Sequence, residues 1–269
     1  MTLYNELSMN LKRLMIGTPL ERPARIFHRL LIGGPHATSN IAEWELRDAR
    51  DNAYVRALLR NKLKRDSNCI DVGAHSGFFL CQFIEFAPEG RHWAFEPIPA
   101  LAAELKRNFP SVKVHECALS DQEGQTTFQY VPELPGWSGL RAQPYPVRTH
   151  PQTIHVELRR LDSLIAQDAP IAFIKIDVEG AELEVLRGAA EILRRQNPIV
   201  LFECAKIHHS HYDTTSKAIH EFLTRYGMGV FLLDQTGPLT LQAFTDVYEA
   251  SHRSGYDRTA QSNYLAMPA

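Results

Sequence analysis

The chain has 269 residues, of which 44% are hydrophobic and 22% charged, and its 29 basic and 31 acidic side chains give a formal charge of −2. This apolar fraction is large enough for a packed core, which argues against intrinsic disorder. The near-zero net charge argues against a globally basic nucleic-acid-binding protein. Because the sequence contains no stretch of about 18 consecutive apolar residues, we expect no membrane span.

The length favours one large domain with an accessory segment. We expect residues 1–65 to form a partly helical N-terminal extension that serves as a lid or docking segment. Residues 66–269 are predicted to form the main domain, with an insertion at 125–160. The start of the chain lacks the apolar run of a signal peptide, and the four cysteines form no C-x-x-C pair. Both features favour a cytoplasmic location, with the cysteines as core residues.

Short apolar runs alternate with helical stretches along most of the chain. The first half predicts a helix at 41–65, strands at 69–72, 92–95 and 112–115, and helices at 78–86 and 100–108. The second half predicts strands at 171–176, 198–202, 230–233 and 263–266, with helices at 181–195 and 216–226. This alternation predicts a largely parallel sheet that is covered by helices on both faces.

The segment at 125–160 breaks this alternation. Residues 126–131 and 154–158 alternate like exposed strands, and the stretch between them is rich in Pro and Gly and contains Trp137 and Tyr145. A long irregular connection inside a compact domain is usually functional. Two interpretations stay open, namely one wall of a substrate pocket and a decorated surface loop.

The segment at 69–79 is predicted to form a strand, a turn of small residues and the start of a helix. Ligands of open parallel sheets bind at the carboxyl ends of the strands, and a residue such as Gly73 lets the backbone approach them. A dinucleotide fingerprint needs glycine where this chain has His75 and Phe78, and no P-loop pattern follows. The turn therefore suits a nucleoside without a pyrophosphate. S-adenosylmethionine is the obvious candidate, and its amino-acid end could meet Asp71 and the turn backbone.

Glu96 ends the second predicted strand, about 20 residues after the glycine turn. An acidic side chain at this place can accept hydrogen bonds from both ribose hydroxyls of a nucleoside. NAD would use the same acid, so only the glycine pattern separates the two cofactors. After the third strand, residues 117–121 either cradle an adenine edge or form a plain exit from the strand.

A further acidic group follows the strand predicted at 171–176. Asp177 emerges at the carboxyl end of that strand and lies beside the glycine turn if the two strands are neighbours. Its carboxylate could then face a sulfonium and an acceptor hydroxyl. Glu179 and Glu182 open the next predicted helix, where the helix dipole favours acids. This capping role accounts for Glu182 but not for Asp177.

Together, DVGAHSG at 71–77, FEP at 95–97, ALSD at 118–121 and IKIDVEGAELEVLRG at 174–188 resemble the FkbM-type methyltransferases. The resemblance covers residues 66–235 and implies a Rossmann-like class I methyltransferase of α/β class. This fold has a seven-stranded, mostly parallel sheet, helices on both faces and an antiparallel final hairpin. The resemblance also implies methyl transfer from S-adenosylmethionine to a hydroxyl of a sugar, glycan or natural product. Family members commonly have Asn in place of His75, a departure that either alters how the turn holds the methionine end or leaves it unchanged.

The residues expected to bind the cofactor lie at the ends of the predicted strands. They are Asp71, Gly73, Ala74, His75, Gly77, Phe78, Glu96, Pro97, Ala118, Leu119 and Asp177. Asp177 is also the first choice for orienting or deprotonating the acceptor, and Glu179 is a further catalytic candidate.

Three histidines, His208, His209 and His211, follow the end of a predicted strand, within reach of the site. Three interpretations stay open. In the first, all three are ordinary loop histidines. In the second, His208 or His209 is a general base. In the third, the histidines bind a divalent ion together with Glu203 or Asp177. Their spacing is not a recognised metal motif, so a metal is not implied and no metal ligand is assigned.

Other function classes compete with methyl transfer to oxygen. An NAD-dependent oxidoreductase is disfavoured by His75 and Phe78, and a non-catalytic nucleoside-binding module by the presence of both Glu96 and Asp177. A nucleic-acid methyltransferase is disfavoured by the net charge. The Asn/Asp-Pro-Pro-aromatic pattern of amino-methylating enzymes is missing at 177–180, which favours oxygen. We expect a small-molecule or glycan acceptor and no nucleic-acid partner, and a homo-oligomer stays open.

Overall fold

The structure is a computed structural model that describes residues 38–143, 145, 148–250 and 261–269. The chain divides into two compact units, Met1–Leu46 and Arg47–Ala269. Helix α3 (Thr38–Lys62) begins in the first unit and ends in the second. Residues 1–37, most of the predicted lid or docking segment, lie outside the described residues, so its role stays a prediction.

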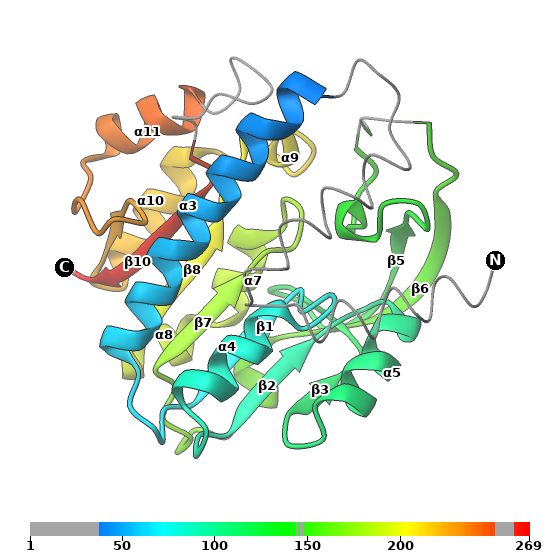
Figure 1. Cartoon of the computed structure of the whole chain (residues 1–269), viewed down its shortest axis with the longest axis horizontal. Coiled ribbons are helices and arrows are strands. Elements are labelled where there is room, and N and C mark those ends of the chain that lie inside the picture. Colours follow the sequence, from blue (N-terminus) through cyan, green and yellow to red (C-terminus); the bar gives the residue numbers. More distant parts are fainter. Residues whose placement is uncertain (1–37, 144, 146–147, 251–260) are drawn as a thin grey trace. The chain divides into compact units, whose positions relative to one another are not determined.

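A seven-stranded sheet forms the centre of the second unit, with strand order β3-β2-β1-β7-β8-β10-β9 (Figure 1). The strands are β1 Cys69–Val72, β2 His92–Phe95, β3 Lys113–His115, β7 Phe173–Ile176, β8 Ile199–Glu203, β9 Met228–Phe231 and β10 Asn263–Pro268. Neighbouring strands from β3 to β8 are parallel, whereas β10 is antiparallel to both β8 and β9. The predicted seven-stranded, mostly parallel sheet with an antiparallel final pair is thereby confirmed.

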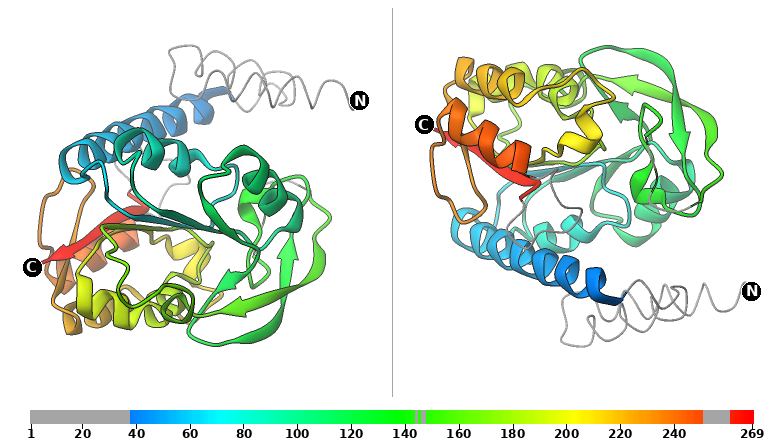
Figure 2. Two further views of the ribbon diagram at one scale, coloured as in Figure 1. Left: turned by 90° about the horizontal axis from the view of Figure 1, so that it is seen from below. Right: turned by 90° about the horizontal axis from the view of Figure 1, so that it is seen from above.

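Both faces of this sheet are apolar, because successive residues of a strand point to opposite sides and the central strands are buried throughout. Phe173 belongs to one core layer, with Leu59 of α3 and Phe83, and the next residue, Ile174, belongs to the other layer, with Leu186. Helices α4 (Phe78–Phe86) and α5 (Pro99–Asn108) cover the first face, and α7 (Glu182–Gly188), α8 (Ala190–Gln196), α10 (Ser216–Arg225) and α11 (Leu241–Ala250) cover the second (Figure 2).

The prediction of a single helix at 181–195 is wrong, because the structure divides this segment into two helices, α7 and α8. Helix α7 ends at Gly188, where a Cβ atom would lie 2.1 Å from the carbonyl oxygen of Ser120. This close packing of two backbones needs glycine, and glycine is a poor helix former. The strand predicted at 230–233 lies two residues earlier, as β9. Helix α11 and the short helices α6 (Leu161–Leu164) and α9 (Lys206–His209) were not predicted.

A small second sheet contains the segment at 125–160, with strand order β4-β6-β5. Strands β5 (Gly124–Tyr130) and β6 (Gln152–Arg159) form the two exposed strands that were predicted, and they pair antiparallel. Strand β4 (Ala118–Leu119) pairs parallel with β6. A separate apolar cluster with Phe128 and Val156 holds this sheet together. Among the described helices, none is long and apolar enough to cross a membrane.

Replacing Phe173 with Ala should lower the free energy of unfolding by about 3–5 kcal/mol, since this fully buried side chain packs edge-to-face on Phe83. As a control, Tyr54→Ala should change the free energy of unfolding by no more than about 0.5 kcal/mol, since Tyr54 is 38% exposed. Denaturant titration of both variants measures the difference. A loss of less than about 1 kcal/mol in F173A would contradict this description of the core.

Candidate active site

A cavity of about 280 Å³ lies at the carboxyl ends of strands β1, β2 and β7. The predicted site residues that line it are Gly73, Ala74, His75, Phe78, Glu96, Pro97, Ala118, Leu119, Asp177 and Glu179. The opposite wall comes from the second sheet and from the loop that contains the 3₁₀ helix η1 (Pro135–Trp137), including Phe128, Ser138 and Leu140. This placement supports the interpretation of the 125–160 segment as one wall of a pocket.

The glycine turn follows β1 and runs against the end of β7. Gly73 has φ +73°, and a Cβ atom on it would lie 1.9 Å from the backbone oxygen of Asp177. His75 also has a positive φ, of 46°. His, like Asn and Asp, is enriched in this left-handed conformation. The turn therefore accepts His75 as readily as it would accept Asn.

Gly77 immediately precedes helix α4. It lies outside the cavity lining, and a Cβ atom on it would meet the Phe109 ring at 2.3 Å. Its small size lets the start of α4 pack against the residue that ends α5. Gly77 thus contributes through packing, and its direct contact with a cofactor stays a prediction.

Glu96 follows β2 and connects the end of that strand to the glycine turn. Its side chain is buried, and it accepts hydrogen bonds from the backbone N–H of His75 to Oε2 (2.8 Å) and of Ile98 to Oε1 (2.9 Å). Burial raises the pKa of the carboxyl group to about 7, although the two backbone hydrogen bonds and the positive charge of Lys175 oppose this rise. Glu96 is therefore a carboxyl group that titrates near neutral pH at the edge of the cavity.

Lys175, in the middle of β7, is a site residue that sequence reasoning did not assign. Its Nζ donates hydrogen bonds to the backbone oxygens of Gly73 (2.8 Å) and Val72 (3.2 Å). It also lies 3.4 Å from Asp71 Oδ1 and 3.5 Å from Asp177 Oδ2. Burial lowers the pKa of the ammonium group, but Asp177 and Asp71 together outweigh burial, so the pKa is raised overall.

Asp71 is the partner of this cation. Its side chain is 1% exposed, lies outside the cavity lining and forms an ion pair with Lys175, and its contact with the amino-acid end of a cofactor stays a prediction. Burial raises the pKa of Asp71, while Lys175 lowers it. Asp71 and Lys175 are directly opposite in the register of β1 and β7. A lysine inside an apolar strand was the sequence signal for this pair.

Asp177 and Glu179 lie at the end of β7, where both line the cavity. The Asp177 side chain is 43% exposed, whereas that of Glu179 is 16% exposed. Glu179 does not belong to a helix, as was predicted, but to a turn with φ 59°, since α7 begins at Glu182. Burial first, and the negative charge of Asp177 second, raise the pKa of Glu179. Two carboxyl groups of different exposure thus meet at this edge.

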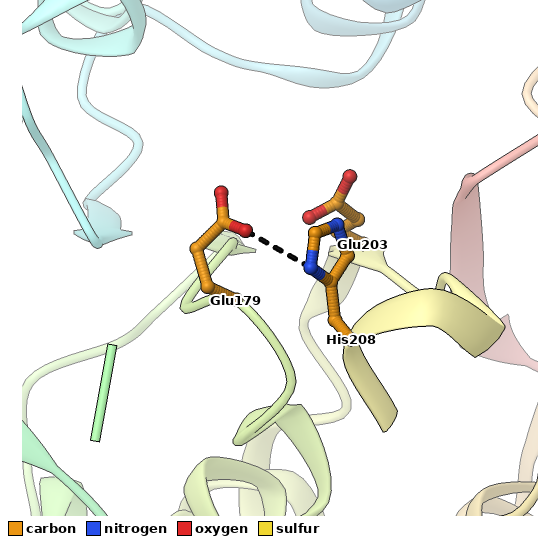
Figure 3. Close-up of side chains that lie close together, drawn as sticks. All are labelled: Glu179, Glu203 and His208. Carbon is orange, nitrogen blue, oxygen red and sulfur yellow. Dashed lines mark ion pairs between the residues drawn. The ribbon is translucent and has the colours of Figure 1, made fainter. Parts of the chain in front are cut away.

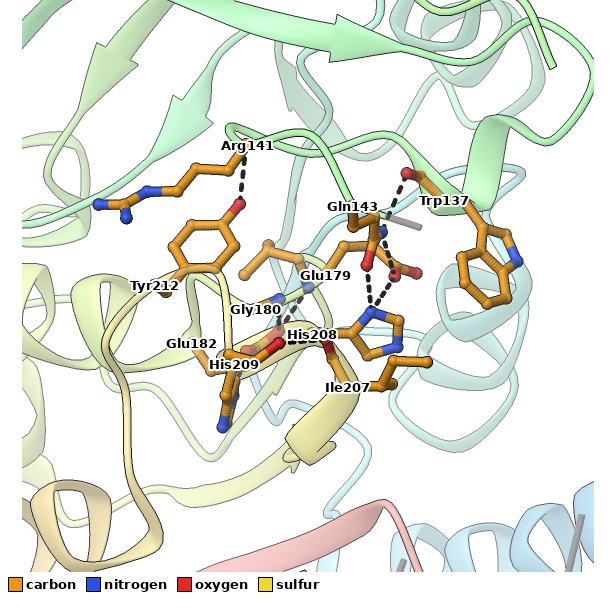
Figure 4. A network of polar contacts seen from close by, with 12 residues as sticks. Trp137, Arg141, Gln143, Glu179, Gly180, Glu182, Ile207, His208, His209 and Tyr212 are labelled. Atoms are coloured by element: carbon orange, nitrogen blue, oxygen red, sulfur yellow. Dashed lines mark hydrogen bonds and ion pairs between the residues drawn. The ribbon is translucent and has the colours of Figure 1, made fainter. Parts of the chain in front are cut away.

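A polar network joins Glu179 to the loop at 131–143 and to α9 (Figure 4). Gln143 donates through its Nε2 to the Trp137 backbone oxygen (3.1 Å) and to Glu179 Oε2 (3.3 Å). His208 Nδ1 lies 2.6 Å from Gln143 Oε1 and 3.1 Å from Glu179 Oε2. Burial lowers the pKa of His208 despite the acidic groups nearby. His208 lies outside the cavity lining but contacts a residue that belongs to it.

His209 is separated from the cavity. It is fully buried, its Nε2 lies 2.9 Å from Glu182 Oε2, and its Nδ1 lies 3.4 Å from the Tyr248 hydroxyl. Glu182 in turn accepts from the backbone N–H groups of Val178 and Gly180, at 3.0 and 3.2 Å. These contacts stabilise the turn that carries Glu179. His209 therefore has the surroundings of a structural residue, and its role as a general base stays a prediction.

Comparison with known proteins agrees with this geometry. The family model described as the methyltransferase FkbM domain matches residues 71–228. The methyltransferase sdnD of Sordaria araneosa is 32% identical over a 155-residue alignment, and the match covers 45% of this chain and 60% of that protein. The 2-O-methyltransferase NoeI of Sinorhizobium fredii is 30% identical over a 148-residue alignment, and the match covers 49% of this chain and 61% of that protein. This chain thus spans less than two thirds of the length of either relative.

A solved structure of a methyltransferase FkbM from Methylobacillus flagellatus is 19% identical, with a TM-score of 0.45, and covers 76% of this chain and 44% of that one. The family match extends over more than half of the chain. It includes the glycine turn, Glu96, Asp177 and Glu179. The chain therefore belongs to the methyltransferase FkbM domain family and has the Rossmann-like class I methyltransferase fold.

Proposed function

We propose that the protein is an S-adenosylmethionine-dependent O-methyltransferase that acts on a hydroxyl of a sugar, glycan or other natural product. The observation that carries this proposal is that the glycine turn and Glu96 line one cavity in a member of a methyltransferase family. His75 and Phe78 line the cavity where a pyrophosphate would need glycines, so a nucleoside without one fits better. One relative is named a 2-O-methyltransferase, which supports oxygen as the acceptor atom.

Glu96 is suited to bind the ribose. A carboxylate oxygen has two lone pairs, and each oxygen of Glu96 uses one of them on a backbone N–H. One acceptor site on each oxygen is therefore left for a ribose hydroxyl. We expect the methionine end to be held by residues 73–76 and Asp177, because Asp71 lies outside the cavity lining. Ala118 and Leu119 line the region proposed for the adenine edge.

The chemistry requires an acceptor hydroxyl in line with the methyl–sulfur bond, and positioning alone supplies much of the acceleration. S-adenosylmethionine, when bound, supplies a methyl group on a positively charged sulfur. With the cofactor bound, Asp177 would orient the acceptor hydroxyl and take its proton as that oxygen receives the methyl group, and the cofactor would leave as S-adenosylhomocysteine. Glu179 lies beside Asp177 at the edge of the same cavity.

The expected partners are a small-molecule or glycan acceptor and no nucleic acid, in line with the near-zero net charge. We also propose a cytoplasmic location, in which the buried thiols of Cys69, Cys117 and Cys204 stay reduced.

Replacing Gly73 with Ala should weaken the binding of S-adenosylhomocysteine at least about tenfold, or about 1.4 kcal/mol, because the new Cβ collides with the Asp177 carbonyl. Gly227→Ala is the matched control. Gly227 has the same φ of +73° but open space around it, so its variant carries the backbone strain without the collision. Calorimetric titration of the folded variants measures both affinities. Equal losses in the two variants, or no loss in G73A, would argue against the turn as the cofactor site.

The affinity for S-adenosylhomocysteine should rise with pH from 6 to 8, because ribose hydroxyls donate to an ionised Glu96 whose pKa is raised to about 7. Below that pH the carboxyl group holds a proton, which occupies an acceptor site. The expected rise is about tenfold over this range, from the change in the ionised fraction. Glu96→Gln should bind more weakly and show a flat profile. A pH dependence that E96Q retains would assign the titration to another group.

Replacing Asp177 with Asn should lower kcat by about 10²–10⁴-fold, the usual contribution of a general base, when S-adenosylmethionine is kept at saturating concentration so that a weaker hold on its methionine end does not limit the rate. The rate is measured with the best acceptor from a screen of sugars, glycans and hydroxylated natural products. Asp246→Asn, an exposed change on α11, serves as the control and should leave kcat unchanged. Near-full turnover in D177N would remove Asp177 from the mechanism.

A further inference from the structure

Beside the cavity, Glu179, Glu203 and His208 each bring one possible ligand atom to within 4.8 Å of the others (Figure 3). Glu203 is the last residue of β8, and Glu179 follows the end of β7, the neighbouring parallel strand. His208 belongs to α9, which begins three residues after β8. Three separate segments therefore converge on one point, and Glu179 connects that point to the cavity.

The carboxyl group of Glu203 lacks positive partners. Apart from the carboxyl group of Asp177, the described residues supply it with no hydrogen-bond donor, and its charged neighbours are the acids Asp177, Glu179 and Glu182. The nearby ammonium group, that of Lys175, is held by Asp71 and Asp177. The cluster thus holds more negative than positive charge, and a cation would be stabilised there.

His208 presents a nitrogen that can act as a ligand. Gln143 donates its Nε2 to the Trp137 oxygen and to Glu179, so its Oε1 must accept from His208 Nδ1–H. This hydrogen bond fixes the tautomer and leaves the Nε2 lone pair without a hydrogen-bond partner among the described residues. The residue is 8% exposed, and Figure 3 shows the second ring nitrogen on the side of Glu203. Metal-binding histidines commonly donate their other N–H to a carbonyl or carboxylate in this way.

We propose that Glu179, Glu203 and His208 bind a divalent cation that accepts both oxygen and nitrogen ligands, such as Mn²⁺ or Zn²⁺. Two carboxylates and one imidazole form a mixed set, whereas Ca²⁺ and Mg²⁺ take mainly oxygen ligands. Because Glu179 lines the cavity, the cation would lie at its edge, where it could hold the acceptor oxygen as a Lewis acid. This consequence for the acceptor rests on the proposed function, whereas binding of the metal does not.

The test is the binding of Mn²⁺ alone to full-length protein that has been freed of metal with a chelator and then of the chelator. We expect one Mn²⁺ per chain in calorimetry and a matching loss of the free-Mn²⁺ signal in electron paramagnetic resonance. Glu203→Gln and His208→Gln should each weaken binding at least about tenfold. Zn²⁺ should compete for the same site. Mn²⁺ should also raise the Tm of the wild type and leave that of E203Q unchanged.

Glu133→Gln is the matched control. Glu133 and His150 also form a His–carboxylate pair, with Nδ1 2.8 Å from Oε1, but their side chains are 39% and 73% exposed and they belong to no three-residue cluster among the described residues. The control should bind Mn²⁺ like the wild type. Circular dichroism shows whether each variant is folded, and if one ligand variant unfolds, the other decides. Absence of Mn²⁺ and Zn²⁺ binding to the wild type, or unchanged binding in E203Q and H208Q, would overturn the proposal.

A second measurement separates this proposal from the proposed function. Binding of S-adenosylhomocysteine to the metal-free protein should persist, because its expected contacts, the glycine turn and Glu96, are not metal ligands. Metal binding without binding of S-adenosylhomocysteine would refute the proposed function and support the metal site. Binding of S-adenosylhomocysteine without metal binding would refute the metal site and support the proposed function.

Discussion

The ammonium group of Lys175 is a positive charge buried inside the central sheet, and the arrangement of the site depends on how that charge is compensated. It contacts the carbonyl oxygens of Val72 and Gly73 and lies between the carboxylates of Asp71 and Asp177. These contacts join the end of β1 to the end of β7. Removing one partner of a buried ion pair typically costs about 3–5 kcal/mol, because the other charge is left uncompensated. One buried cation thus holds both the glycine turn and Asp177 in place.

Beyond Lys175, the edge of the cavity is rich in acids. Asp177, Glu179 and Glu203 lie close enough that their negative charges influence one another. Such a site favours a ligand that brings positive charge. The sulfonium of the proposed cofactor has this charge, and so does the proposed divalent cation. The two proposals therefore draw on the same electrostatic property, and Glu179 belongs to both.

Local patterns predicted much of the fold. Strands β1, β2 and β7 are short, mostly apolar segments that are buried at every position, and the glycine turn together with Glu96 and Asp177 followed from motif spacing. The break between α7 and α8 was missed because its cause, the contact of Gly188 with Ser120, joins segments far apart in the sequence. The pairing of Lys175 with Asp71 and the placement of His208 beside Glu179 likewise require the tertiary fold.

The central claim is that the cavity holds S-adenosylmethionine, with the ribose on Glu96 and the methionine end at the glycine turn. A crystal structure of the protein with S-adenosylhomocysteine tests this claim most directly. The account predicts both ribose hydroxyls within hydrogen-bond distance of the Glu96 carboxylate and the thioether sulfur facing Asp177. A complex in which the ligand lies elsewhere, or in which Glu96 keeps only its bonds to His75 and Ile98, would contradict it.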